Sequence, residues 1–223
     1  MWPMSDMKDI WPRPHYNVPP KDHLHAVAVI SLNYNIFKGG LFGLFRHHLE
    51  VSGMHRTLVE RLYGALGGAD HGQAIRDVFT FYEKDPAVID RVEHMLAYFQ
   101  WSFEARNLLM HSQQRGITLD DREDIMSLYK RSKKNYSKMN FMVFKVPELR
   151  KIADSIHAGY LYLVDLYFFL QVRDGQLPPW IPTTDEHRVL PDKSPIPKKI
   201  EVSDSHPIYV VSTTADPADQ NQS

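Results

Sequence analysis

The chain has 223 residues, of which 43% are hydrophobic and 24% are charged, proportions typical of a globular protein with a sizeable core. Its 26 lysines and arginines nearly balance 27 aspartates and glutamates. The net charge of −1 therefore excludes attraction of the whole surface to nucleic acid or to an anionic membrane, and an anionic partner would need a local basic patch. The absence of cysteine excludes disulfides and thiolate metal sites and fits a reducing cytoplasm.

Proline positions divide the chain into a long middle and two irregular ends. Five prolines lie within residues 1–21 and eight within 174–223, whereas only Pro86 and Pro147 lie between. Because proline is disfavoured inside helices, we predict an irregular segment over 1–21, one helical domain over 22–173 and a disordered, Pro-rich tail over 174–223. The first residues include an early aspartate and no apolar run, so they do not resemble a secretory signal, and we expect a cytoplasmic protein.

Apolar residues recur at three- and four-residue steps through the middle and predict an all-α bundle of about five to six helices. The two interior prolines mark helix starts, because Asp85 can cap the helix that Pro86 begins and Glu148 follows Pro147 in a first turn. The expected helices cover about residues 22–48, 54–66, 73–83, 86–111, 123–135 and 148–172, with a brief extended piece over 140–146.

The most membrane-like stretch lies within the first expected helix, over residues 26–45. Asn33, Asn35, Lys38 and two adjacent glycines interrupt it near its centre, and each is unfavourable in hydrocarbon. We therefore predict a buried core helix rather than a membrane span.

The fourth expected helix ends in an R-N-x-x-x-H motif formed by Arg106, Asn107 and His111. Arginine carries five donors suited to phosphate, and histidine exchanges a proton near neutrality because its ordinary pKa is about 6.5. Such a pair suffices for phosphodiester chemistry without a metal. The alternative is that Arg106 pairs with surface glutamates, that Asn107 is incidental, and that His111 sits favourably at the negative end of a helix dipole.

The motif, the basic stretch 128–134 and the helix beginning at 147–153 together resemble the HEPN superfamily over about residues 85–172. The resemblance implies a homodimeric helical bundle and a metal-independent endoribonuclease, with Arg106 and His111 catalytic and Asn107 supporting them. It also implies a toxin–antitoxin or antiphage defence setting, with a neutralising antitoxin protein as partner. Other members have lost catalysis and bind RNA, a nucleotide or a protein.

The spacing of the motif fits the homodimer that the resemblance implies. Five positions on an ideal helix rotate by about 140°, so Arg106 and His111 do not share a face, and one chain alone makes a poor pocket. A two-fold axis at this helix would bring two arginines and two histidines to one cleft.

A run of basic residues supports RNA as the partner. Residues 129–151 contain eight lysines and arginines and a single acid, a density suited to phosphate. We assign RNA binding to four of them: Lys130, Arg131, Lys133 and Lys134. The alternative is a solvated helix face. DNA lacks the 2′-hydroxyl nucleophile, so we expect it to survive.

Histidine pairs raise the question of a metal, chiefly His23 with His25 and His47 with His48. No H-x-x-x-H or E-x-x-H pair occurs, so the usual ligands on one helix face are missing, and we expect neither a metal nor another cofactor. A third hypothesis stays open, a helical dimer without a nucleic-acid role, for which the near-zero net charge and the apolar last helix suffice.

Overall fold

The computed structural model describes residues 21–67, 70–114, 125–131 and 139–201. These residues are mainly helical, which confirms the predicted all-α class. The elements, in chain order, are α1 (Lys21–Val51), α2 (Arg56–Ala65), α3 (His71–Tyr82), α4 (Pro86–Met110), β1 (Gln113–Gln114), β2 (Ile125–Arg131), β3 (Met139–Lys145), α5 (Val146–Arg173) and a 3₁₀ turn, η1 (Asp185–Arg188).

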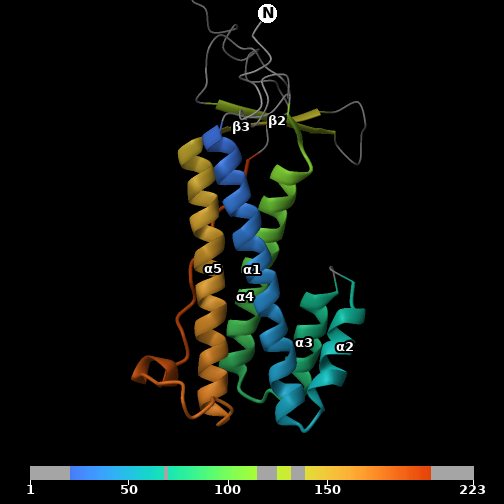
Figure 1. The fold of residues 1–223 in the computed structure, drawn as a ribbon, viewed down its shortest axis with the longest axis vertical. Helices are drawn as coiled ribbons and strands as arrows, with labels where there is room; N and C mark the ends of the chain where they lie inside the picture. Colours follow the sequence, from blue (N-terminus) through green and yellow to red (C-terminus); the bar gives the residue numbers. More distant parts are fainter. Residues whose placement is uncertain (1–20, 68–69, 115–124, 132–138, 202–223) are drawn as a thin grey trace, which may run out of the picture. The chain divides into compact units, whose positions relative to one another are not determined.

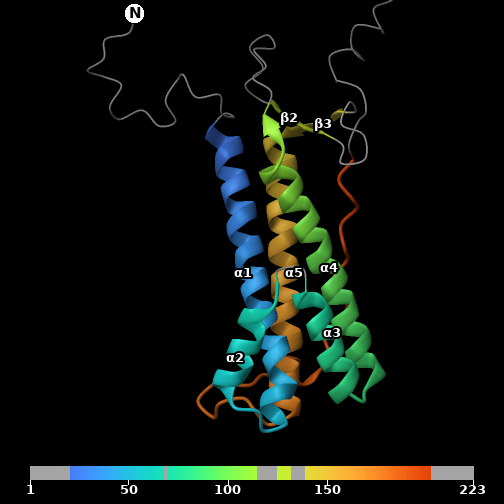
Figure 2. The same cartoon turned by 90° about the vertical axis from the view of Figure 1, so that its right-hand side faces the viewer.

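Internal contacts divide the chain into two compact units, where the sequence predicts a single domain. The larger unit comprises residues 29–106 and 151–199 and contains most of each long helix. The smaller unit comprises residues 1–28, 107–150 and 200–223 and contains the sheet. Within the larger unit, α1, α4 and α5 run alongside one another, and α2 and α3 lie beside the second half of α1 (Figures 1 and 2).

The core of the larger unit follows the apolar spacing of the sequence. The Phe37 ring of α1 contacts the Tyr98 ring of α4, and both rings are fully buried. Both also lie against Gly159 of α5. A Cβ atom on Gly159 would lie 2.6 Å from the Tyr98 ring and 2.8 Å from the Phe37 ring, so glycine is what lets the helices approach. The Tyr98 hydroxyl donates to the carbonyl of Ser155, 2.8 Å away.

The predicted basic helix over residues 123–135 is wrong, because β2 occupies Ile125–Arg131 as a strand. It pairs antiparallel with β3, from Ile125 opposite Lys145 to Arg131 opposite Met139, in a sheet of order β1-β2-β3. The reason is a two-residue alternation that buries Met126 and Leu128. The extended piece predicted over 140–146 is confirmed by β3.

Residues 174–201 belong to the tail, whose disorder stays a prediction. This segment is irregular apart from η1, yet α4 side chains bind its backbone carbonyls. Arg91 donates to Pro191 (2.9 Å), His94 to Ser194 (2.7 Å) and Trp101 to Lys198 (3.1 Å). Proline has no backbone N–H to donate, but the backbone carbonyls of this segment accept hydrogen bonds. Polar side chains of α4 therefore hold the segment in place although it has little regular secondary structure. Residues 202–223 lie outside the described residues, as do residues 1–20 of the irregular segment predicted over 1–21, whereas Lys21 begins α1.

Within the described ranges, α1 alone is long and apolar enough to cross a membrane by length and composition, and 28% of its most apolar window is buried within the protein. The core helix of a globular protein passes the same test. One face of α1 is core, as predicted, with Ile30, Phe37 and Leu41 fully buried, and Asn33 donates to the carbonyl of Ala153 at 3.0 Å.

Candidate functional site

The R-N-x-x-x-H motif lies at the carboxyl end of α4, as the sequence predicts. Arg106 and Asn107 belong to its last turns, and His111 follows the final helical residue, Met110. The His111 side chain is exposed, and its backbone N–H donates to the carbonyl of Asn107 at 3.1 Å. The boundary between the two units falls between Arg106 and Asn107, so the arginine belongs to the helical unit and the histidine to the smaller one.

Arg106 packs against an aromatic ring inside the helical unit. Its guanidinium carbon lies 5.7 Å from the centre of the Tyr34 ring, within the range of a cation–π contact, which contributes about 0.5–1 kcal/mol at such sites. Burial raises the pKa of Tyr34, and the positive charge of Arg106 offsets part of that rise. Arg106 therefore has a packing role in addition to any chemical one.

Two of the four predicted RNA-binding residues lie in a strand rather than on a helix face. Lys130 and Arg131 lie in β2, opposite Asn140 and Met139 of β3, and the Lys130 side chain is partly exposed. Lys133 and Lys134 lie outside the described residues. Of the four, the structure therefore places only the two strand residues.

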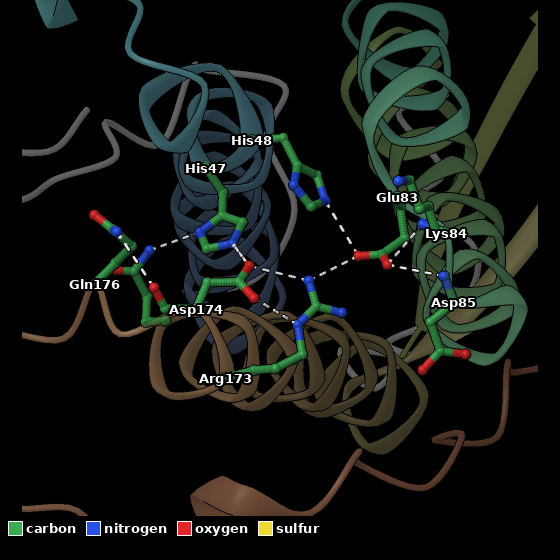
Figure 3. Close-up of polar contacts among 9 residues, drawn as sticks. His47, His48, Glu83, Lys84, Asp85, Arg173, Asp174 and Gln176 are labelled. Atoms are coloured by element: carbon green, nitrogen blue, oxygen red, sulfur yellow. Dashed lines mark hydrogen bonds and ion pairs between the residues drawn. The ribbon is translucent and has the colours of Figure 1, made fainter.

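A second polar cluster, which sequence reasoning missed, joins the ends of three helices in the larger unit. It consists of His47 and His48 near the end of α1, Glu83 directly after α3, Arg173 at the end of α5, and Asp174. Figure 3 shows His47 facing Asp174 and His48 facing Glu83, with the guanidinium of Arg173 between the two carboxylates. We call these five residues the two-histidine cluster.

The cluster is tightly connected. His47 Nε2 lies 2.7 Å from Asp174 Oδ2, and His48 Nε2 lies 3.3 Å from Glu83 Oε2. Arg173 bridges the two acids, with its Nε 2.7 Å from Asp174 Oδ1 and its Nη2 2.8 Å from Glu83 Oε2. The side chains of His47, His48 and Glu83 are 0%, 7% and 5% exposed, whereas those of Asp174 and Arg173 are 19% and 28% exposed.

Burial and neighbouring charges decide the protonation of the cluster. Burial lowers the pKa of His47 by more than the hydrogen bond to Asp174 raises it, and burial together with His47 lowers the pKa of His48. Burial alone would raise the pKa of Glu83 and of Asp174, but hydrogen bonds, chiefly from Arg173, lower both. Near neutral pH the imidazoles are therefore uncharged and the carboxylates ionised.

Neutral imidazoles and ionised carboxylates are the forms that bind metal ions. His47, His48 and Asp174 each offer one ligand atom, and these atoms lie within 4.8 Å of one another. The sequence hides this set because the histidines are adjacent rather than four residues apart, and because Asp174 follows 127 positions after His47. The one available signal was a pair of histidines in an otherwise apolar helix.

Comparisons of the chain with models of known families, with curated proteins and with solved structures find no match. The function therefore has to be inferred from the residues themselves.

Proposed function

We propose that the protein is a metal-independent endoribonuclease of the HEPN type, acting as a homodimer in the cytoplasm. Arg106 and His111 are its catalytic residues, and Asn107 orients the histidine or a phosphate oxygen. The observation that carries the proposal is the motif's position. It ends α4, and an exposed His111 follows the helix directly, where a polynucleotide can reach it.

The reaction needs no external nucleophile. His111 removes the proton from a ribose 2′-hydroxyl, the oxygen attacks the adjacent phosphorus, and the bond to the 5′-oxygen breaks. A protonated imidazole, the symmetry mate of His111 in the dimer, returns a proton to the leaving oxygen. The products are a 2′,3′-cyclic phosphate and a 5′-hydroxyl.

Arg106 stabilises the negative charge that grows on the non-bridging oxygens through paired, charge-assisted hydrogen bonds. Loss of such a donor costs about 3 kcal/mol, or about a hundredfold in rate. Basic residues in the sheet supply phosphate contacts. Lys130 lies in β2 of the same unit as His111, which supports this assignment. A toxin or antiphage role would add a neutralising protein partner.

The test is cleavage of labelled RNA by the purified full chain in EDTA, compared with His111→Ala and Arg106→Ala. A matched control is His157→Ala, which removes an exposed histidine of α5 outside the motif. We expect cleavage by the wild type and the control, loss of about a hundredfold or more in the motif variants, and no cleavage of DNA or of 2′-deoxy-substituted RNA. Cleavage that persists in both motif variants would reject the proposed chemistry.

A second candidate function is a non-catalytic HEPN-like module that binds RNA, a nucleotide or a protein. The contact of Arg106 with the Tyr34 ring favours it, because a guanidinium committed to packing is less able to follow a phosphate. This candidate predicts RNA binding without cleavage. Cleavage of RNA by the wild type separates the two candidates, and circular dichroism of Arg106→Ala measures the packing role independently, since loss of that packing lowers thermal stability whether or not RNA is cut.

A further inference from the structure

Residues of the two-histidine cluster carry side-chain atoms that can also bind a metal ion. His47, His48 and Asp174 each offer one ligand atom, and these atoms lie within 4.8 Å of one another. Glu83 Oε2 lies 3.3 Å from His48 Nε2 and accepts from Arg173 Nη2 at 2.8 Å. Tetrahedral zinc, with bonds of about 2.0–2.2 Å to nitrogen and oxygen, places its ligand atoms about 3.3 Å apart. The 2.7 Å between His47 Nε2 and Asp174 Oδ2 has to widen by about 0.6 Å.

His48 is the member of the cluster whose hydrogen bonding is incomplete. Its side chain is 7% exposed and its Nε2 is buried, yet this atom forms no hydrogen bond with any described residue. Leaving a buried polar atom unsatisfied costs about 1–3 kcal/mol. A metal ion bound at Nε2 would remove that cost, whereas the hydrogen-bonded network around Arg173 leaves it in place.

The neighbouring residues are arranged as supports of a metal site. The Gln171 side-chain amide lies 2.8 Å from His47 Nδ1, so with its oxygen turned toward the ring it would fix the imidazole with Nε2 free to bind a metal. Arg173 donates to both carboxylates, with its Nη2 2.8 Å from Glu83 Oε2 and 3.0 Å from Asp174 Oδ2, and so holds Asp174 beside the histidines. Partners of this kind orient metal ligands and raise affinity.

Charge also favours a cation. Beside the imidazoles, the cluster contains two carboxylates and one guanidinium. The mixed imidazole and carboxylate set selects zinc-like ions over Mg²⁺ and Ca²⁺, which prefer oxygen ligands alone. We propose that His47, His48 and Asp174 bind one Zn²⁺ ion, with water as the fourth ligand, and that this ion fastens the end of α1 to the end of α5.

The site goes beyond the proposed function, because none of its residues belongs to the R-N-x-x-x-H motif. The full chain is stripped with chelator and dialysed, and its melting temperature is then measured during titration with Zn²⁺ or Mg²⁺. Bound metal is counted by mass spectrometry. We expect one more zinc per chain than in His48→Asn, and a rise of about 5–10 °C when free zinc reaches a hundred times the Kd, with no response to Mg²⁺.

The chain holds 12 histidines, so the comparison between variants decides the result rather than the total zinc bound. His48→Asn and Asp174→Asn should lose the extra zinc and the thermal shift, whereas His157→Gln, which changes an exposed histidine, should keep both. If a variant misfolds, Co²⁺ added to the wild type should still give the visible absorption of a four-coordinate nitrogen and oxygen site. No zinc-dependent shift in the wild type, or an unchanged shift in folded His48→Asn, would overturn the proposal.

Failure of this proposal is distinguishable from failure of the ribonuclease proposal. The zinc test reads stability and stoichiometry without RNA. RNA cleavage in EDTA is measured well below the melting temperature of the stripped protein, with helicity followed by circular dichroism. Loss of cleavage while the stripped chain stays folded counts against the metal-independent chemistry alone.

Discussion

Replacement of Gly159 by alanine tests how closely α5 approaches α1 and α4. An exposed helical glycine gains about 1 kcal/mol of stability when changed to alanine. At Gly159 the new Cβ would lie 2.6 Å from two carbons of the Tyr98 ring and 2.8 Å from one carbon of the Phe37 ring. Carbon atoms pack comfortably at about 3.5–4.0 Å, so about 1 Å of separation is missing at three contacts.

The rings have little freedom to move away. Tyr98 is 1% and Phe37 0% exposed, and the Tyr98 hydroxyl is tethered to the backbone of α5. Overpacking of a dense core costs about 1–3 kcal/mol, and three rigid contacts place this case at the upper end. After the gain in helix propensity, we expect Gly159→Ala to lower the free energy of unfolding by about 2 kcal/mol, which lowers the melting temperature by about 4–8 °C.

The assay is urea unfolding followed by circular dichroism, with Gly39→Ala as the matched control. Gly39 also lies inside a long helix, but a Cβ there meets nothing within 4 Å. We expect the control to gain about 0.5–1 kcal/mol, so the two substitutions should have opposite signs at equal m-values. A Gly159→Ala protein as stable as the wild type, beside a stabilised control, would refute the packing argument.

Three further substitutions test other contacts of the larger unit. In metal-free protein, Arg173→Ala should lower the free energy of unfolding by about 3 kcal/mol, because Glu83 stays buried without the cation that pairs with it. A loss below 0.5 kcal/mol in chemical denaturation would show that the ion pair contributes nothing. Tyr98→Phe removes one hydrogen bond and should cost about 1 kcal/mol in the same assay, and an unchanged midpoint would contradict this. His94→Ala removes the bond to the Ser194 carbonyl and should speed amide hydrogen exchange across residues 190–199 while the long helices keep their protection; unchanged exchange there would show that the bond does not hold this segment.

The R-N-x-x-x-H motif shows what the local sequence pattern predicts. Its position at the end of a helix follows from the spacing of apolar residues after Pro86, and α4 confirms that position. Its chemistry stays a prediction, because catalysis depends on how two arginines and two histidines meet in a dimer.

The sequence by itself determined the elements whose signals are local. Helix starts at the two interior prolines, the buried stripe of α1 and the extended piece over β3 all follow from the periodicity of neighbouring residues. The same reasoning failed for β2, where basic residues at helical spacing masked the alternation of Met126 and Leu128, and strand pairing across a loop decided the outcome.

Only the tertiary structure decided the contacts between distant residues. The tail over residues 174–201 has too few apolar residues to predict docking, yet α4 donates hydrogen bonds to its carbonyls. His47 and Asp174 meet across 127 positions, and Glu83 enters from a third helix. Such charges converge only when packing of the apolar faces brings helix ends together, because no local period encodes which ends will meet.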